Sequence, residues 1–385
     1  MFMVRSQIII LNKVINFMTN SLKGLIQKKH KFLTGFNPSY KITNKILSML
    51  TAIAESKSVI EHAKILPQNE IKLRRQALIR MTHSSTKIEG NRLNLEQVEN
   101  VIANKKIDAP ERDIYEVQNY FKAIKYIEKI VHNKQLISER VLLKIHAIAT
   151  EKTLRKEQSG HFRKGPIYVV RRQFMMKDEI MYIGPSAKEV PNLCADLIAW
   201  IRESKKQNIN PVIVAGIIHQ EIAAIHPFAD GNGRTARAMA TLILYQRGYD
   251  FRHLFALEDY YNKDRSKYYD AINIGKNYYE RKVDFTSWLE YFVKGFKEEI
   301  DNVKAQILTL PFRKIKNGIK SKVYLDKDQL QLLEFVDQMG KITAKDAIDI
   351  LNCSKRTAQL KLHQLKNISI IVQIGKGPSS AYVLK

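Results

Sequence analysis

The sequence predicts a mainly helical protein of more than one domain, with one β-hairpin in its body and a smaller α+β module at its C-terminus. Its 385 residues exceed the length of a single small domain. Apolar side chains recur at helical spacing through most of the chain, whereas its middle contains one pair of strand-like runs. With 45% hydrophobic and 26% charged residues, the composition is that of an ordinary globular protein, which excludes wholesale disorder.

The net charge indicates which classes of partner the protein contacts, and the cysteine content indicates its compartment. A net charge of +26 favours contact with nucleic acid, nucleotides, anionic membranes or acidic protein surfaces, although a lysine-rich genome would produce much of the same excess. Cys194 and Cys353 are far apart and outside any metal-ligand spacing, so we expect a reducing, cytoplasmic location. No apolar run reaches the roughly 18 residues that span a bilayer, so we expect no membrane contact.

The N-terminal segment differs from the rest of the chain. The first 50 residues carry eight basic and no acidic side chains, and we expect residues 1–40 to form a basic leader. Two interpretations are open: a disordered arm that contacts an anionic partner, or an extension upstream of the true start. Met18 is a candidate for that start, and residues 1–17 would then not be translated.

Helical periodicity defines an N-terminal helical region, residues 41–110, and a core, residues 111–310. Ser138 and the Asn210–Pro211 pair are typical of helix starts. Helices are expected at about residues 46–53, 60–63, 73–81, 111–131, 138–149, 190–203, 211–225, 235–247 and from 268 to the end of the 280s. The runs at 166–170 and 179–183 are rich in β-branched and aromatic residues and predict the hairpin.

A change of pattern separates the C-terminal module from the body. Residues 311–322 contain five basic side chains, a glycine and no acidic side chain, which is typical of a linker. Beyond them, residues 323–385 predict three helices followed by a hairpin. This order is the layout of a winged helix-turn-helix domain.

The most informative segment reads IHPFADGNGRTAR and covers residues 225–237. Gly231 and Gly233 flank Asn232 where a helix begins, so backbone N–H groups there can approach an anion without interference from Cβ atoms. Arg234 and Arg237 are three residues apart and therefore lie on one face of that helix, where they can bind neighbouring phosphates.

Two further side chains of this segment suggest chemistry. Asp230 is the nearest carboxylate and could hold the Mg²⁺ that accompanies a nucleotide. His226 is the only group in the segment that can act as a base near neutral pH. His219, with Glu221, could suggest a metal site, but we interpret it as a packed helix histidine.

The segment resembles the signature of the Fic family, HxFx(D/E)GNGRxxR, and every defining position is filled. The resemblance extends over roughly residues 40–300, where 160–163 (GHFR), 182–200 and 258–269 are similar to other family segments. It implies a Fic-type helical bundle in which the hairpin at 165–183 is a flap. A winged helix after such a core is a familiar arrangement in bacteria.

The resemblance implies transfer of AMP from Mg-ATP to a Tyr, Thr or Ser hydroxyl of a target protein. His226 would be the catalytic base, Asp230 would hold Mg²⁺, and the flap would bind an extended segment of the target as an added strand. The α-phosphate would be bound by Asn232 together with the backbone amides of the loop at Gly231 and Gly233. Arg234 would bind the β-phosphate and Arg237 the γ-phosphate. Tyr268 and Tyr269 would line the base pocket.

A second pattern lies upstream at residues 84–91, SSTKIEGN. Ser85, Glu89 and Gly90 fit the family's inhibitory motif, [S/T]xxxE[G/N]. The resemblance implies that Glu89 pairs with Arg237, denies this arginine to the γ-phosphate and keeps the enzyme switched off at rest. In some relatives the same glutamate positions a water molecule that removes AMP, so the reverse reaction is an open alternative.

The C-terminal module carries a candidate recognition helix at residues 354–366. Its candidate DNA contacts are Lys355, Arg356, Gln359 and Lys361, with Lys376 at the tip of the wing. Residues 321–385 hold ten basic and six acidic side chains, a difference of +4, which is modest for a DNA-binding module. Docking of a protein is therefore equally open.

Other functions are compatible with the same motifs. Removal of AMP, or transfer of another phosphate-linked group, would keep the fold, although the GNGR form argues against the phosphotransferase branch of the family. A DNA-binding regulator that only senses nucleotide is a third hypothesis, against which the intact His226 argues because sensing needs no base. The target protein, the signal that relieves inhibition and the formation of a homodimer are left open.

Overall fold

The computed structural model describes residues 35–63, 65, 67–171, 179–273, 275–281, 283–309, 325–375 and 380–385. Most of the predicted leader, the linker at 311–322, the tip of the flap and Lys376 lie outside these residues. The described part is mainly helical, as expected, and contains one two-stranded and one three-stranded sheet. None of its helices is long and apolar enough to cross a membrane.

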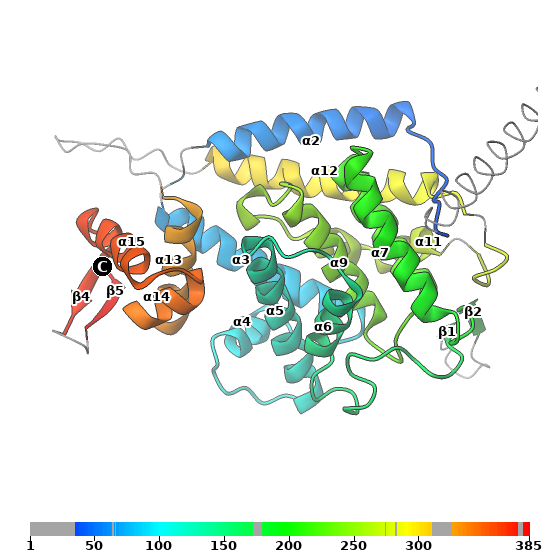
Figure 1. Ribbon diagram of the computed structural model, residues 1–385, viewed down its shortest axis with the longest axis horizontal. Coiled ribbons are helices and arrows are strands. Elements are labelled where there is room, and N and C mark those ends of the chain that lie inside the picture. Colours follow the sequence, from blue (N-terminus) through cyan, green and yellow to red (C-terminus); the bar gives the residue numbers. More distant parts are fainter. Residues whose placement is uncertain are drawn as a thin grey trace, which may run out of the picture.

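The body contains most of the helices, and Figure 1 shows their arrangement. Their bounds are α2 (Asn44–His62), α3 (Pro67–Ile88), α4 (Leu95–Ile102), α5 (Glu111–His132), α6 (Glu139–Ala149), α7 (Val190–Lys206), α8 (Pro211–Ile225), α9 (Asn232–Gln246), η1 (Phe251–His253), α10 (Leu257–Lys263), α11 (Arg265–Ile272) and α12 (Thr286–Thr309). The flap strands are β1 (Tyr168–Arg171) and β2 (Glu179–Ile183).

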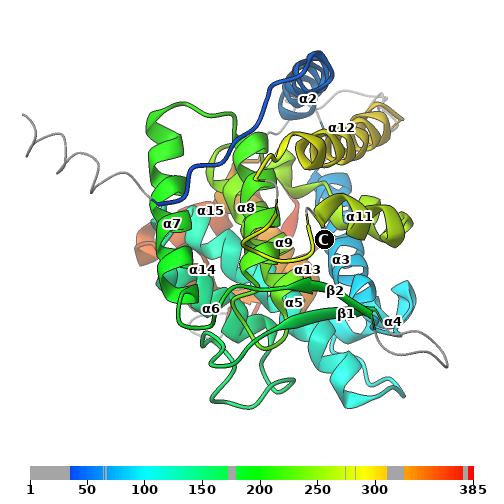
Figure 2. The ribbon, with the colours of Figure 1, turned by 90° about the vertical axis from the view of Figure 1, so that its right-hand side faces the viewer.

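Helices α8 and α9 form the centre of the body, and other helices surround them (Figure 2). Almost every residue of α8 is buried, which is typical of a helix that is apolar on all faces. Asn210 caps its first turn by accepting a hydrogen bond from the N–H of Val212, and Pro211 occupies the first helical position, as the sequence predicted.

Helices α2 and α12 lie side by side and run parallel at the edge of the body (Figure 1). Residues preceding α2 pack on the same body: the Phe36 ring meets that of Trp200 at 5.5 Å, and Ser39 O accepts a hydrogen bond from Phe285 N–H at 2.9 Å. The predicted leader boundary at residue 40 is therefore too late, because residues 35–40 belong to the packed body.

The flap is an antiparallel hairpin in which Tyr168 pairs with Ile183 and Arg171 with Glu179. Its second strand is fixed to the body, since Ile183 exchanges backbone hydrogen bonds with Lys276 and Tyr278 at 2.9 and 3.0 Å. The helix expected from residue 268 to the end of the 280s is wrong: α11 ends at Ile272, and the side chain of Asn277 accepts two backbone N–H groups in a turn.

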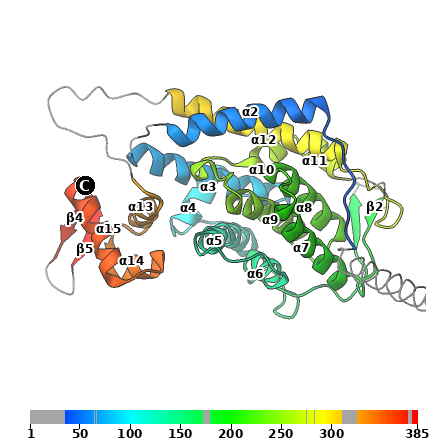
Figure 3. The same cartoon turned by 45° about the horizontal axis from the view of Figure 1, so that its top comes forward.

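The C-terminal module comprises α13 (Lys327–Met339), β3 (Ile342–Thr343), α14 (Ala344–Leu351), α15 (Lys355–Asn367), β4 (Ile371–Ile374) and β5 (Ala381–Leu384). These elements give the predicted order of three helices and a hairpin, with the short β3 added to form a sheet of order β3-β5-β4. Figure 3 shows this module at the end of the body where α3 begins. Ile71 of α3 belongs to the module's apolar core.

Candidate active site

The segment singled out by the sequence forms the loop between α8 and α9. His226 ends α8 in the left-handed region, with φ 50° and ψ 58°, and Gly231, with φ 78°, precedes α9. The side chain of Asn232 closes the loop by accepting the N–H of Phe228 and donating to its C=O, both at 2.9 Å. The amide nitrogen of Asn232 carries a second N–H, so this group and the backbone N–H groups of the first turn of α9 are donors available to an anion.

His226 is arranged to act as a base. Its Nδ1 lies 2.9 Å from the carbonyl oxygen of Ala223, and a carbonyl only accepts, so Nδ1 carries the hydrogen and Nε2 keeps a free lone pair. Burial lowers the pKa of the imidazole below its ordinary value of 6.5. The neutral ring that a general base requires is therefore the form present at neutral pH.

The sequence analysis missed His146, a buried residue of α6 that supports the loop. Its ring lies parallel to that of Phe228, with centroids 3.6 Å apart. Nδ1 accepts the N–H of Gly160 and Nε2 donates to the C=O of Asp230, at 2.9 and 3.0 Å. Burial lowers the pKa of His146 to about 4, so the ring is neutral and can serve both contacts. No pattern around His146 signals this contact, because its partners lie elsewhere in the chain.

Arg163 joins the loop to the flap. The sequence placed it in a family segment without assigning it a role. Its Nε donates to the carbonyl of His226, while its two terminal nitrogens donate to those of Gly165 and Pro185, over 2.6 to 2.8 Å. One buried guanidinium thus fixes the backbone of the candidate base and both ends of the flap.

The ion pair expected between Glu89 and Arg237 is present. Arg237 donates to Oε1 of Glu89 at 2.8 Å, and to both the side chain and the carbonyl of Ser85 at 2.9 Å. Burial is the largest single effect and disfavours the charge of Arg237, but Glu89, Tyr268 and Tyr120 together outweigh it, so the pKa of the guanidinium is raised. Gly90, with φ 94°, turns the chain after α3 and leaves Glu89 facing this arginine.

The carboxylate of Glu89 also lies against the first turn of α9. A Cβ atom added to Gly233 would collide with Oε1 of Glu89 and would meet a terminal nitrogen of Arg237 at 3.1 Å. A negatively charged group at the N-terminus of a helix is stabilised by the exposed N–H groups and the helix dipole. Glu89 therefore occupies part of the region that the sequence assigned to phosphate.

The remaining charged residues of the loop form a second network. Arg234 is 1% exposed and lies 3.7 Å from Glu116 and 3.8 Å from Asp230. Asp230 accepts the N–H of Gly231 with one oxygen and pairs with Arg112 at 3.0 Å through the other. Within the described ranges, no three His, Cys, Asp or Glu side chains gather as a metal site. The carboxylate of Asp230 is 40% exposed, and carboxylate oxygen is a ligand that suits a Mg²⁺ ion bringing phosphate ligands with it.

The two tyrosines expected at the base pocket differ in position. Tyr268 is buried, and its hydroxyl lies 2.9 Å from Nε2 of His219 and 3.5 Å from Arg237. His219 is itself fully buried among aromatic rings, which agrees with its interpretation as a packed helix histidine. Tyr269 is 45% exposed and donates to the carbonyl of Ile88 at 3.1 Å, so it borders the open side of the inhibitory segment.

The candidate DNA contacts separate into two groups. Lys355, Arg356 and Gln359 are exposed on α15. Lys361 instead pairs with Asp326 and Asp328 at 2.6 and 3.2 Å, so its ammonium group is held within the module. This arrangement corrects the expectation that Lys361 is available to DNA, because its charge is already balanced by α13 and its cap.

Comparisons with known proteins agree with this geometry. The Fic/DOC family model matches residues 136–244, which run from the start of α6 through α9. Residues 136–244 of this chain are a Fic/DOC domain. The match contains His146, Arg163 and the whole loop between α8 and α9, so the residues that the sequence analysis missed lie inside the Fic domain along with those that it found.

Curated proteins that are similar to this chain are named protein adenylyltransferase Fic. Those of Drosophila mojavensis and Culex quinquefasciatus are 27% and 28% identical over 202 and 203 residues, 52% of this chain in each case. The aligned region covers only 36% and 37% of their own lengths.

Solved structures of two bacterial proteins share the fold. A Fic family protein from Desulfovibrio desulfuricans G20 has a TM-score of 0.59 at 24% identity, over 91% of this chain and 98% of its own. A Fic domain signalling protein from Bacteroides thetaiotaomicron has a TM-score of 0.56 at 17% identity, over 68% of this chain and 96% of its own.

Proposed function

We propose that this Fic protein is a protein adenylyltransferase that transfers AMP from ATP to a hydroxyl group of a target protein. One observation carries the proposal: the neutral His226, with Nε2 free, directly precedes a loop whose helix N-terminus and two buried arginines can bind phosphate. The curated relatives named protein adenylyltransferase, which are 27% and 28% identical over 52% of this chain, support it.

In the proposed reaction, Nε2 of His226 accepts the proton of the target hydroxyl. The hydroxyl oxygen forms a bond to the α-phosphorus, the bond between this phosphorus and the bridging oxygen breaks, and pyrophosphate leaves with its electron pair. Backbone N–H groups at the start of α9 bind the negative charge on the α-phosphate, while Arg234 and Arg237 bind the departing phosphates. Each role is filled by a residue of the one loop and helix.

Asp230 would hold the Mg²⁺ ion. Bound there, Mg²⁺ would neutralise part of the phosphate charge. In the present arrangement Arg112 occupies one oxygen of this carboxylate, with 62% of its own side chain exposed. A surface pair of this kind contributes little energy, so Arg112 can give way to a nucleotide that carries its metal.

Glu89 would inhibit the reaction by competing with ATP. Its carboxylate neutralises Arg237 and lies against Gly233, so the γ-phosphate meets a negative charge where it needs a positive one. Nucleotide would then bind without the alignment that attack on the α-phosphorus needs. Removal of this side chain is expected to release Arg237 for the γ-phosphate.

The flap would bind the target. Strand β2 is paired on both sides, with β1 and with residues 276–278, whereas β1 has no partner on its outer edge among the described residues. An extended segment of a protein can add to such an edge as a further strand. Arg163 would set the position of this strand relative to His226, because it contacts the backbone at both ends of the flap and the carbonyl of His226.

ATP labelled on the α- or the γ-phosphorus provides the test. The Glu89→Gly protein is incubated with a cell lysate and each label in turn, with Glu89→Gly/His226→Ala as the control. Because kinases of the lysate use the γ-label in every sample, each signal is compared with that of the double variant. AMP transfer predicts extra protein labelling from the α-label alone. Extra labelling from the γ-label would show phosphate transfer instead, and loss of α-label on adding wild-type protein would show that AMP removal is its main reaction.

The C-terminal module is proposed to recruit a partner through α15. The exposed Lys355, Arg356 and Gln359 support an anionic partner, and DNA is the first candidate. A gel shift of the full chain with duplex DNA at two salt concentrations, compared with a Lys355→Ala/Arg356→Ala variant, tests this proposal. Equal DNA binding by the variant would exclude these two side chains as the contact, and no shift of the wild-type chain would favour docking of a protein instead.

A further inference from the structure

The C-terminal module and the inhibitory glutamate are connected to the same helix. Helix α3 is continuous over 22 residues. Ile71, near its start, belongs to the apolar core of the C-terminal module, whereas Ser85 in its last turn binds Arg237 and Glu89 follows its last residue. At 1.5 Å per residue, about 21 Å of chain separates Arg75 from Glu89 along this axis.

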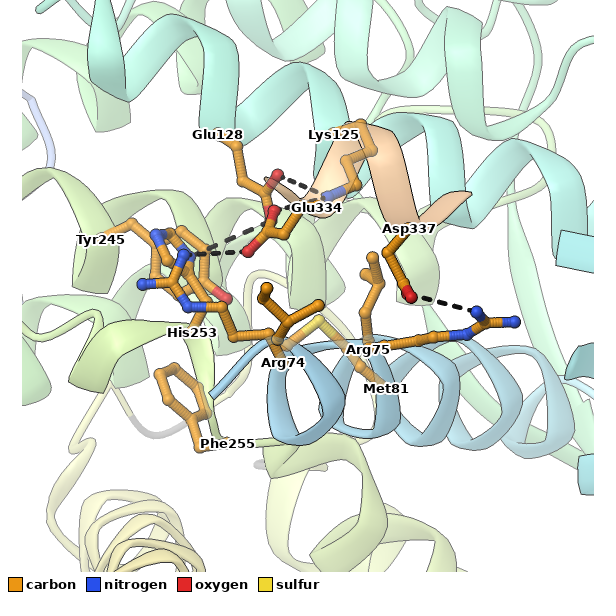
Figure 4. Close-up of a pocket in the computed structure, with 12 residues that line it drawn as sticks. Arg74, Arg75, Met81, Lys125, Glu128, Tyr245, His253, Phe255, Glu334 and Asp337 are labelled. Atoms are coloured by element: carbon orange, nitrogen blue, oxygen red, sulfur yellow. Dashed lines mark hydrogen bonds and ion pairs between the residues drawn. The ribbon is translucent and has the colours of Figure 1, made fainter. Parts of the chain in front are cut away.

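Two acidic residues of α13 bind the first half of α3. Glu334 accepts hydrogen bonds from Arg74 at 2.9 Å and from Lys125 of α5 at 3.4 Å, and Asp337 pairs with Arg75 at 3.3 Å. Figure 4 shows these carboxylates pointing from α13 toward the basic side chains of α3 and α5. We refer to these five residues as the α13–α3 junction.

The buried part of the junction fixes the position of the two helices. Arg74 is 8% and Glu334 15% exposed. Burial alone would raise the pKa of the Glu334 carboxyl, but Lys125 and Arg74 lower it to about 2, so the group is charged at neutral pH. Such a buried pair adds little net stability. Displacement of α13 takes Glu334 away from both of its basic partners, whereas Arg74 keeps Glu70 and Lys125 keeps Glu128 as partners.

The two helices touch through the side chains of the junction. The gap left where these side chains meet is about 20 Å³, room for about one water molecule, while larger hollows of about 920 and 980 Å³ open beside Arg74 and Glu334 and beside Arg75 and Asp337. A shift of α13 is therefore transmitted to α3 by direct contact. Further along α3, Arg80 and Ser84 bind Asp259 of α10 at 2.7 and 2.6 Å, which carries the same fixed alignment to the last turn.

We propose that docking of α13 on α3 through the α13–α3 junction holds the end of α3 in its inhibitory position, so that release of the C-terminal module weakens the Glu89–Arg237 ion pair. By reciprocity, nucleotide that displaces Glu89 loosens the docked module. The effect on activity rests on the proposed function, whereas the coupling between the two ends of α3 does not.

Hydrogen exchange measured on the full-length protein tests the coupling without any reaction. Glu334→Gln removes the charge at the centre of the junction, and Asp337→Arg places a like charge beside Arg75. We expect exchange in residues 83–91 to become about fivefold faster or more in both variants. Asp349→Asn, which removes an exposed carboxylate of α14, is the matched control and should leave these rates unchanged.

A charge swap separates loss of the contact from damage to the module. Adding Arg75→Glu to Asp337→Arg re-forms the pair with reversed signs and should restore slow exchange in residues 83–91. If exchange in these residues stays at the wild-type rate in both single variants, the proposal is overturned. If the double variant exchanges as fast as Asp337→Arg alone, the proposal is likewise overturned, because the faster exchange would then come from damage to the fold.

Transfer of AMP gives the second measurement. Glu334→Gln is expected to raise transfer about fivefold or more when Glu89 is present, and to have no effect when it is added to Glu89→Gly. A rise of equal size in both backgrounds would overturn the proposed route through Glu89. If exchange changes as expected but Glu89→Gly itself transfers nothing, the proposed function fails and the coupling stands.

Discussion

The substitution Glu89→Gln removes the charge of the inhibitory side chain and keeps its shape. In the wild-type protein the buried guanidinium of Arg237 donates to Glu89 at 2.8 Å. A hydrogen bond between charged groups contributes roughly 1.5 to 3 kcal/mol. Because 30% of the Glu89 side chain is exposed to solvent, we take about 2 kcal/mol after discounting for screening, which is roughly a 30-fold change in an equilibrium constant.

This change should appear in the affinity for nucleotides that reach Arg237. Calorimetric titration with Mg²⁺ present should show ATP binding to Glu89→Gln roughly 30-fold more tightly than to wild type. AMP lacks the phosphates that reach Arg237, so its affinity should change little. Glu96→Gln, on the exposed face of α4, changes the net charge equally and should bind ATP like wild type. Equal ATP affinities for Glu89→Gln and wild type would refute the competition between this carboxylate and phosphate.

Three further predictions concern the loop and the flap. Gly231→Ala places a Cβ atom within 2.7 Å of Thr150 on a backbone with φ 78°, and it should lower the free energy of unfolding by about 2 kcal/mol. Gly248→Ala is the control, because Gly248 has φ 77° but open space around it, and it should cost clearly less. Equal losses in thermal unfolding would show that the loop is not tightly packed. The neutral form of His226 is the base, and burial lowers its pKa below 6.5. The transfer rate of Glu89→Gly should therefore rise with pH, with a midpoint below 6.5, and then level off. A midpoint above 6.5 would contradict the assignment of His226 as the base. In Arg163→Lys, the lysine side chain cannot bind the three carbonyl groups that Arg163 binds. The transfer rate in stopped assays should fall about tenfold or more while the affinity for ATP stays unchanged. An unchanged rate would exclude a positioning role for Arg163.

The central residues of the site could be predicted because they are close in sequence. The spacing of His226, Asp230 and the two arginines is local, and helix geometry places them around one loop. The pair between Glu89 and Arg237 spans 148 residues, and only a family resemblance could predict it. His146 was missed because its contacts to Gly160 and Asp230 follow from tertiary packing, to which spacing along the chain gives no signal.

Contacts between residues distant in sequence also account for the expectations about the fold that were wrong. Residues 268–285 contain apolar side chains at helical spacing, but Asn277 binds backbone N–H groups and Ile183 pairs with Lys276, so tertiary pairing prevailed over local propensity. Lys361 lies on the predicted recognition helix, yet it pairs with Asp326, which is 35 residues away. The α13–α3 junction was not predictable, since Arg74 and Glu334 are 260 residues apart.

Intact mass after incubation with Mg-ATP tests the central claim most directly. Wild type, Glu89→Gly and Glu89→Gly/His226→Ala are compared at equal concentration, with ATP binding confirmed for each. We expect Glu89→Gly alone to transfer AMP to a hydroxyl group of its own chain and so to gain the mass of AMP, since it combines a free Arg237 with an intact base. An equal gain in wild type or in the variant without His226 would contradict the proposed mechanism, whereas no gain in any of the three despite bound ATP would mean that the separate target protein is the required acceptor or that the reaction is not AMP transfer.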